Sequence, residues 1–256
     1  MTQSNHGKVL GVIPARIGST RIPGKMLKDI CGKTLIQQTY ERSKGATSLD
    51  EIVIATDSDE IEAVAKSFGA RVIRSVADHQ NGTERAGEAT KLFTDFEPEI
   101  VVTIWGDEPL YPASAIDRCV EMLRNDEEIQ VVTAADRITN PAMISVNSVV
   151  KIVTDLKNRA LYISRATIPY NFRNGQVDYY HVIGAMAMRR NFLAEYISLP
   201  QTPLELLEGV EQLRILENGY KLGLVKGDFD NLGVNTPEEY EEVVKIFERR
   251  LTEAKK

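Results

Sequence analysis

The chain has little cysteine, histidine and tryptophan, and it carries no surplus of positive charge. With only Cys31 and Cys119, a disulfide framework and a four-cysteine zinc site are excluded. The histidines, His6, His79 and His181, lie far apart and show no metal-ligand spacing. Lys and Arg number 31 against 37 Asp and Glu, and the resulting charge of −6 argues against a general binder of nucleic acid or anionic membranes.

Long apolar runs are also missing. No run approaches the length of a membrane-spanning helix, and residues 1–8 lack the apolar core of a secretory signal. We therefore expect a cytoplasmic protein. Hydrophobic residues make up 43% of the 256 residues, which is ordinary for a globular protein and enough for one large core.

Short apolar runs alternate with amphipathic segments in the first half of the chain. Strands are expected at Val9–Ile13, Glu51–Thr56, Ala70–Arg74 and Glu99–Ile104, and helices at Thr34–Gly45, Ser58–Phe68 and Glu84–Phe93. This alternation predicts an α/β fold with a mostly parallel, Rossmann-like sheet and helices on both faces.

The second half of the chain is less regular. Its expected strands are Val131–Ala135, Val149–Asp155, Arg159–Tyr162 and Tyr180–Met188, and its expected helices are Asn191–Ile197, Leu204–Asn218 and Thr236–Glu253. No repeat or long linker separates these elements. We expect a single domain over residues 1–256, with a small lobe around residues 164–204.

A basic loop follows the first strand. Pro14 is expected to stop that strand, because proline lacks an N–H group and its φ is fixed. Gly18 and Gly24 allow the backbone to approach a ligand closely. The positive charges of the loop are Arg16, Arg21 and Lys25. Such a loop favours a polyphosphate ligand, and a solvated basic turn is the alternative.

Two further segments can carry chemistry. Asp107 follows the strand that ends at Ile104, and ligands of open α/β sheets lie at the carboxyl ends of strands. Its carboxylate can hold Mg²⁺, unless the segment is only a strand exit. The segment His79–Arg85 places polar groups before a helix, where Thr83 can cap the helix and free N–H groups can meet a base or phosphate. A simple capping turn is the alternative there.

Long, irregular motifs over residues 9–245 resemble one enzyme family. They are Val12-Ile13-Pro14-Ala15-Arg16, Ser19-Thr20-Arg21-Ile22-Pro23-Gly24-Lys25, Ala55-Thr56-Asp57, Asp78-His79-Gln80-Asn81-Gly82-Thr83-Glu84-Arg85, Gly106-Asp107-Glu108-Pro109, Ala160-Leu161-Tyr162-Ile163-Ser164-Arg165-Ala166-Thr167-Ile168-Pro169, Glu211-Gln212-Leu213-Arg214 and Gly233-Val234-Asn235-Thr236-Pro237-Glu238-Glu239. This set is similar to the 3-deoxy-manno-octulosonate (Kdo) cytidylyltransferases, or CMP-Kdo synthetases.

The resemblance implies a nucleotidyltransferase-type fold, transfer of CMP from CTP to a 2-keto-3-deoxy sugar acid with release of pyrophosphate, a role in lipopolysaccharide biosynthesis, Mg²⁺ as cofactor and a homodimer formed through the small lobe. It assigns the catalytic roles to Arg16, Lys25 and Asp107. The implied CTP contacts are Pro14, Ala15, Gly18, Ser19, Thr20, His79, Gln80, Asn81, Gly82 and Thr83. The implied acceptor contacts are Trp105, Arg165, His181, Glu211 and Gln212, and the implied metal positions are Asp107 and Asn235.

Three positions depart from the family pattern. Asn235 stands where the family has a second metal-binding aspartate, and Asp230 is a nearby substitute in the sequence. Trp105 stands where the family has glutamine, and residues 181–188 lack the family's tyrosines. Two explanations are open. The changes are ordinary divergence within the family, or the chain is a paralogue that activates a modified Kdo, another nonulosonate-like sugar or a phosphonate. A CTP-binding regulatory relative with little turnover and a nucleotidyltransferase acting on a sugar or alcohol phosphate are further alternatives.

Overall fold

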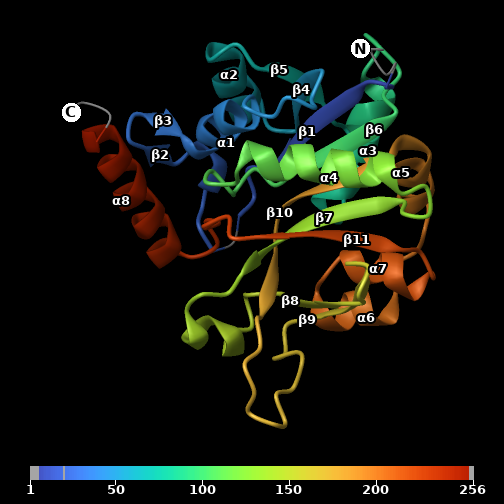
Figure 1. The fold of residues 1–256 in the computed structure, drawn as a ribbon. Helices are drawn as coiled ribbons and strands as arrows, with labels where there is room; N and C mark the ends of the chain where they lie inside the picture. The colour runs from blue at the N-terminus through green and yellow to red at the C-terminus, as the bar shows by residue number, and fades with distance from the viewer. Residues whose placement is uncertain (1–5, 20, 254–256) are drawn as a thin grey trace, which may run out of the picture. The chain divides into compact units, whose positions relative to one another are not determined.

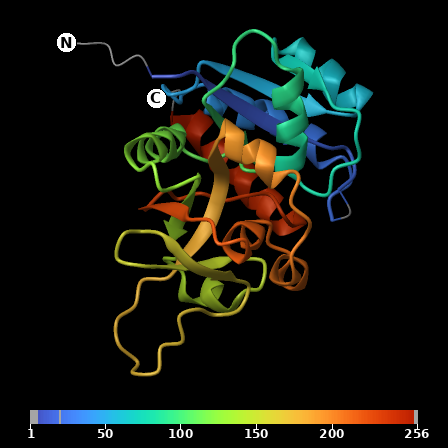
Figure 2. The same cartoon turned by 90° about the vertical axis from the view of Figure 1, so that its right-hand side faces the viewer.

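The structure is a computed structural model that describes residues 6–19 and 21–253 (Figures 1 and 2). Its internal contacts divide the chain into two units. Unit 1 comprises Met1–Ser114 and Asn231–Lys256, and unit 2 comprises Ala115–Asp230. The chain therefore leaves unit 1 after its first 114 residues and returns to it for the C-terminal segment.

Unit 1 is built on a parallel sheet. Its strand order is β6 (Ile100–Ile104), β1 (Val9–Ala15), β4 (Glu51–Thr56) and β5 (Arg71–Arg74). The core strands β1 and β6 are almost continuously buried, as expected for parallel strands covered by helices. The helices α1 (Leu35–Ser43), α2 (Asp59–Ser67) and α3 (Gly82–Leu92) connect these strands (Figure 1). The predicted α/β class is confirmed.

Capping side chains set where these helices begin. Thr34, Ser58 and Asn81 each accept a hydrogen bond from a backbone N–H in the first turn of α1, α2 and α3. The expectation that Thr83 caps the third helix is wrong, because Asn81 takes that place and α3 begins at Gly82.

Pro14 does not end the first strand, which runs to Ala15. The pairing of β1 with β6 stops at Val12, so Pro14 borders only β4, where it lies opposite Ala55. A proline that faces one neighbouring strand interrupts fewer ladder hydrogen bonds than one inside a sheet.

The last helix, α8 (Pro237–Glu253), belongs to unit 1. Its Val243 is fully buried in a cluster with Ile22, Ile30 and Leu35, and Phe247 packs against the same cluster. The intervening short elements are η1 (Lys25–Leu27), β2 (Asp29–Ile30) and β3 (Lys33–Thr34). This packing brings the C-terminal segment onto the loop that follows β1.

Unit 2 contains a mixed arrangement of strands. β7 (Val131–Arg137) pairs in parallel with β11 (Leu222–Gly227) and antiparallel with β10 (Tyr180–Arg189). β8 (Lys151–Thr154) pairs antiparallel with both β10 and β9 (Ala160–Ser164). Its helical segments are α4 (Ala113–Asn125), η2 (Pro141–Ser145), α5 (Arg190–Tyr196), α6 (Pro203–Glu208) and α7 (Gln212–Glu217). Helix α4 was not expected from the sequence pattern.

The predicted helix Leu204–Asn218 is two helices. Gly209, with φ of +60°, ends α6 in the left-handed region, and α7 begins at Gln212. Apolar periodicity continues across the break, which is why the sequence pattern suggested one helix.

A bulge interrupts the pairing of β10 with β7. Ile183 lies opposite Ala134, but the next pair is Met186 with Thr133, so two residues of β10 have no counterpart. Gly184 has a positive φ of +40°, and the Thr133 hydroxyl donates to the Ala185 carbonyl at 2.9 Å. The hydroxyl thereby gives a hydrogen bond to a carbonyl that has no partner in the strand pairing.

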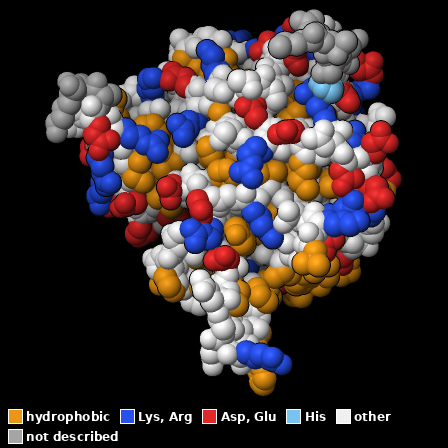
Figure 3. Space-filling model, viewed as in Figure 1, with side chains coloured by type: hydrophobic (Ala, Val, Ile, Leu, Met, Phe, Trp, Pro, Cys, Tyr) orange, Lys and Arg blue, Asp and Glu red, His pale blue; other side chains and the backbone are white. Residues whose placement is uncertain are grey.

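Unit 2 exposes several large apolar side chains. Figure 3 shows hydrophobic side chains gathered over α6 and at the end of the long loop that precedes β10. The exposed residues of these regions are Leu206, Leu207, Tyr170 and Phe172, and Leu161 of β9 is also exposed. Among the helices that the structure describes, none has the length and apolar character needed to cross a membrane.

We predict that Ser58→Ala destabilises the protein through α2. Its hydroxyl accepts from the Ile61 N–H, and losing such a cap costs about 1 kcal/mol, or about 2–4 °C in melting temperature. Ser67→Ala, at the exposed end of the same helix, is the control and should change stability by less than about 0.5 kcal/mol. Equal melting temperatures for wild type and Ser58→Ala would show that the cap carries no weight.

Candidate functional site

The Lys25 ammonium group joins three parts of unit 1. It lies 2.5 Å from Oδ2 of Asp107 and donates to the Val234 carbonyl at 3.0 Å. The Val234 N–H in turn donates to the Asp107 carbonyl at 2.8 Å. The lysine is 9% exposed and the Asp107 side chain is 27% exposed, so the ammonium end of the ion pair is shielded from bulk water. The basic loop, the loop after β6 and the segment before α8 therefore meet at one point.

The residues around Asp107 fit a small hard cation. A carboxylate oxygen and a backbone carbonyl oxygen converge there on the positive charge of Lys25, and Mg²⁺ prefers the same kinds of oxygen ligand. Asn235 follows Val234 directly and offers one amide oxygen. Within residues 6–19 and 21–253 no group of three His, Cys, Asp or Glu side chains forms a metal cluster.

The neighbours of Asp107 and Asn235 are held by their own hydrogen bonds. The Asn231 amide donates to the Glu108 carboxylate at 2.5 Å. The Glu239 carboxylate accepts from the N–H groups of Asn235 and Thr236 at 2.6 and 3.1 Å. These contacts fix the backbone on both sides of Val234, which holds the Lys25 ammonium in place.

The basic loop itself is open to solvent. Arg16 and Gly18 are exposed, and the Ser19 hydroxyl accepts from the Ile22 N–H at 3.3 Å. Gly24 has φ of +61°, a value that suits glycine, and it precedes Lys25 directly. Of the predicted CTP contacts, Thr20 lies outside the described residues.

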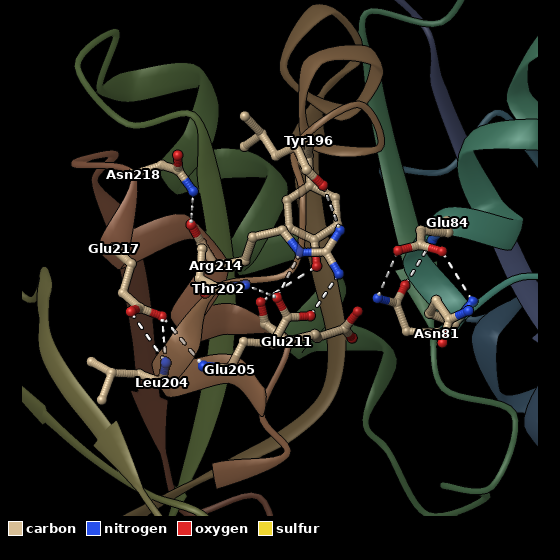
Figure 4. Close-up of polar contacts among 12 residues, drawn as sticks. Asn81, Glu84, Tyr196, Thr202, Leu204, Glu205, Glu211, Arg214, Glu217 and Asn218 are labelled. Carbon is tan, nitrogen blue, oxygen red and sulfur yellow. Dashed lines mark hydrogen bonds and ion pairs between the residues drawn. The ribbon is translucent and has the colours of Figure 1, made fainter. Parts of the chain in front are cut away.

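The start of α3 packs closely on the end of β1. A Cβ atom added at Gly82 would lie 2.9 Å from Cγ of Pro14, which is too close for any side chain. Asn81 and Glu84 hold the helix start together: the Glu84 N–H donates to the Asn81 side chain at 2.9 Å, and the Gln80 N–H donates to the Glu84 carboxylate at 3.0 Å (Figure 4). The two predicted nucleotide segments therefore lie side by side.

The Thr83 hydroxyl is buried in unit 1 with no hydrogen-bond partner among the described residues. Next to this segment, Nε2 of His79 lies 2.6 Å from the Glu88 carboxylate, which also accepts from the Val76 N–H at 3.1 Å. Burial alone would raise the Glu88 pKa, but the hydrogen bonds from His79 and the backbone outweigh it and lower that pKa. Glu88 is therefore an anion that anchors the loop before α3.

Arg85 and Asp57 lie near the site. Both stand in motifs of the family resemblance, but neither was assigned a role from the sequence. Arg85 donates to Asp57 at 2.8 Å and to the Ser75 hydroxyl. Burial would raise the Asp57 pKa, but the hydrogen bond and charge of Arg85 lower it. The sequence feature that could have identified them is the position of Asp57. It follows β4 directly and lies at the same sheet edge as Asp107.

Trp105 follows β6 directly and is partly buried. Gly106, beside it, packs between Ile13, Ile36 and Met26, whose nearest atoms would lie 3.2–3.3 Å from an added Cβ atom. This close packing fixes the backbone between Trp105 and Asp107.

In unit 2, Arg165 is held by backbone carbonyls. Its guanidinium group donates to the carbonyls of Glu208 at 2.5 Å, Asn147 at 2.9 Å and Gly209 at 3.1 Å. The Lys151 ammonium donates to the Arg165 carbonyl at 2.5 Å. Burial, followed by the charge of Arg165, lowers the Lys151 pKa. The pairing of Arg165 with an acceptor carboxylate stays a prediction.

His181 lies on β10 between two charged neighbours. It is opposite Asp136 on β7 and opposite Lys151 on β8. Burial lowers the His181 pKa, and Lys151 lowers it further, whereas Asp136 raises it. The net direction is downward, so the folded protein favours the neutral imidazole.

Glu211 and Gln212 lie at the start of α7. Gln212 is 3% exposed, and the Glu211 carbonyl accepts from the Tyr196 hydroxyl at 3.4 Å (Figure 4). Because Arg165 donates to the carbonyl of Gly209, the structure brings Arg165 close to the chain two residues before Glu211.

Comparisons with known proteins reveal extended similarity. The model of the family described as cytidylyltransferase matches residues 10–222. The 3-deoxy-manno-octulosonate cytidylyltransferase of Solibacter usitatus is 44% identical over 241 residues, which cover 94% of each chain. The enzyme of the same name from Francisella philomiragia is 42% identical over 244 residues, which cover 93% of this chain and 97% of the other.

Solved structures extend this similarity to three dimensions. CMP:2-keto-3-deoxy-manno-octonic acid synthetase complexed with CTP matches with a TM-score of 0.88 and 34% identity, over 95% of this chain and 99% of the other. A cytidylyltransferase from Leptospira borgpetersenii matches with a TM-score of 0.62 and 20% identity, over 96% of each chain, which shows a shared fold.

We predict that His181 makes the protein more sensitive to acid. Because its pKa is lowered on folding, the unfolded chain binds an extra proton as the pH falls through about 6.5, and folding stability drops. The melting temperature of the wild type should therefore fall more than that of His181→Gln between about pH 7.5 and about pH 5.5. Between about pH 7.5 and about pH 8.5 the difference should stay constant. Parallel curves over the acidic range would contradict a folded state that favours the neutral imidazole of His181.

Proposed function

Because the chain belongs to the family of 3-deoxy-manno-octulosonate cytidylyltransferases, we propose that it transfers CMP from CTP to a 2-keto-3-deoxy sugar acid, Kdo or a close relative, and releases pyrophosphate. The observation that carries the proposal is the Lys25 ammonium, held by Asp107 and Val234 beside the basic loop. It places a fixed positive charge where the strands β1 and β6 end.

The reaction needs positive charge at this place. An acceptor oxygen forms a bond to the α-phosphorus of CTP and loses its proton, while the bond from that phosphorus to the bridging oxygen breaks and pyrophosphate leaves. Negative charge spreads over the phosphate oxygens as this happens. Arg16 and Lys25 neutralise that charge, and the loop around Gly18 and Ser19 shapes the phosphate pocket. The start of α3, with Asn81, Gly82 and Thr83, contacts the cytosine of CTP.

We assign Mg²⁺ to Asp107 and the amide oxygen of Asn235. When bound, the metal would polarise the α-phosphate and orient the acceptor oxygen. The support is the carboxylate of Asp107 together with the position of Asn235, which directly follows the residue whose carbonyl binds Lys25. With one carboxylate in the pair, most of the metal's affinity would come from the phosphates of the nucleotide.

We assign Arg165, His181, Glu211 and Gln212 to the sugar acid, and the family resemblance also implies Trp105. A second candidate function is activation of a less hydroxylated acid, such as a modified Kdo or a phosphonate. Trp105 favours it, because an indole ring leaves buried sugar hydroxyls without partners. Pyrophosphate release with each of four nucleoside triphosphates, against a panel of keto acids and phosphonates, tests both candidates. Turnover without a sugar acid or with another nucleotide would refute the proposal.

We further infer a cytoplasmic homodimer that works in lipopolysaccharide biosynthesis. The exposed apolar side chains of unit 2, among them Leu206, Leu207 and Phe172, support a surface for a second copy. The supply of CTP and the chemistry of a sugar acid fit the cytoplasm.

Loss of positive charge in the basic loop should impair catalysis strongly. We expect Arg16→Ala and Lys25→Met each to lower kcat/KM by about 100-fold or more, equivalent to about 3 kcal/mol of transition-state stabilisation. Lys28→Ala, an exposed lysine just beyond the loop, is the matched control and should keep wild-type turnover. Steady-state pyrophosphate release is the measurement, and near-normal turnover in both loop variants would remove the loop from the mechanism.

Substitutions at Asn235 and Trp105 should affect different properties, the Mg²⁺ requirement and the acceptor preference. Asn235→Asp adds a carboxylate beside Asp107, so the Mg²⁺ concentration for half-maximal rate should fall while acceptor preference stays the same. Trp105→Gln should change acceptor preference with little effect on the Mg²⁺ titration. An unchanged Mg²⁺ titration in Asn235→Asp would place Asn235 away from the metal, and Asp230→Asn would then be examined in the same titration.

A further inference from the structure

Unit 2 contains a fully buried ion pair. Arg214 of α7 donates from Nε to Oε2 of Glu205 at 2.8 Å and from Nη2 to Oε1 at 2.6 Å (Figure 4). Arg214 is 1% exposed and Glu205, in α6, is 4% exposed. The two parallel hydrogen bonds fix the distance and the orientation between these short helices.

Stability alone is a weak reason for such a pair. Removing two charges from water is costly, and replacing a buried pair by apolar residues of similar volume often leaves stability unchanged or improves it. What an apolar pair cannot reproduce is the exact geometry of a bidentate contact. The pair is therefore best explained by what it holds in place.

One connection runs from Arg214 to Glu211. The guanidinium group stacks over the ring of Tyr196, 4.8 Å from its centroid, and the Tyr196 hydroxyl donates to the Glu211 carbonyl at 3.4 Å. The Arg214 N–H donates to the same carbonyl at 3.2 Å. The backbone at Glu211 is thus held from two sides, just where Gln212 begins α7.

A second connection runs through α6 to Arg165. The Gly209 N–H donates to the Glu205 carbonyl at 2.8 Å. At the end of α6, the Glu208 carboxylate accepts from the Ser164 hydroxyl at 2.6 Å and from the Arg165 N–H at 2.9 Å. The Glu208 carbonyl also accepts from the Arg165 guanidinium. Moving α6 would therefore move Arg165.

We propose that Glu205 and Arg214 are positioning residues that set the acceptor-binding geometry of unit 2, through Tyr196 on Glu211 and Gln212 and through α6 on Arg165. The inference rests on the proposed function for the identity of the ligand. Neither residue of the pair is exposed, so both act through the segments that they hold.

The test compares the double variant Glu205→Leu/Arg214→Met with Tyr196→Phe. The double variant replaces the charges by apolar groups, and Tyr196→Phe removes only the hydroxyl above Glu211. We expect the double variant to melt within a few degrees of wild type, while its KM for the sugar acid rises about tenfold and its KM for CTP changes less than about twofold. Tyr196→Phe should raise the acceptor KM in the same direction, by about threefold.

The control is Arg189→Met. Arg189 also lies in unit 2 and donates to the backbone carbonyls of Leu123, Asp126 and Ile129, and among the described residues its side chain makes no hydrogen bond to α6 or α7. It should lower the melting temperature and leave the acceptor KM unchanged. Unchanged acceptor KM in both Tyr196→Phe and the double variant, or equal rises in the KM of acceptor and CTP, would overturn the proposal.

Hydrogen exchange separates this inference from the proposed function. Amides at residues 165–166 and 209–213 should exchange faster in the double variant, whether or not the wild type uses a sugar acid. Wild-type protein without turnover on any sugar acid would refute the proposed function, and the exchange rates would still decide the positioning role. Equal exchange rates in wild type and double variant would overturn it.

Discussion

The ion pair of Lys25 with Asp107 is the contact that holds the loops of unit 1 together. Its ammonium group links residues separated by 82 and 209 positions in the sequence, and it keeps a positive charge and a carboxylate at the same strand ends. The fold supplies these partners because parallel strands end at one edge and α8 returns the C-terminal segment to that edge. In the proposed reaction, a charge held in this way would need little reorganisation when phosphates bind.

Unit 2 is built on a different principle. Apart from His181 on β10, its predicted ligand residues lie on or next to short segments, and hydrogen bonds to charged side chains replace long helices as the source of rigidity. Lys151 and Arg214 each hold groups from two segments, and Glu208 holds two consecutive residues, Ser164 and Arg165. Short helices such as α6 and α7 have little stability alone, so their tertiary contacts determine where they lie.

The sequence was sufficient for the family resemblance, which the comparisons confirm, and for the parallel core of unit 1, because buried strands and capped helices have clear local signals. It was insufficient where long-range contacts decide the structure. The break at Gly209 is hidden by continuous apolar periodicity, and Asn81 rather than Thr83 caps α3. The bonds of Arg165 to three carbonyls depend on residues 18 to 44 positions away, which no local pattern reveals.

The bulge in β10 determines how many residues this strand can lose without disturbing the core. His181 precedes the two unpaired residues and Met188 follows them. The strand pairs with β7 on both sides of the bulge. Because neighbouring residues of a strand point to opposite faces, deleting one residue at 184–185 would exchange the faces of everything on one side of the deletion. Deleting two would keep the faces and straighten the strand. Within this chain, only the removal of both residues would therefore leave the core unchanged.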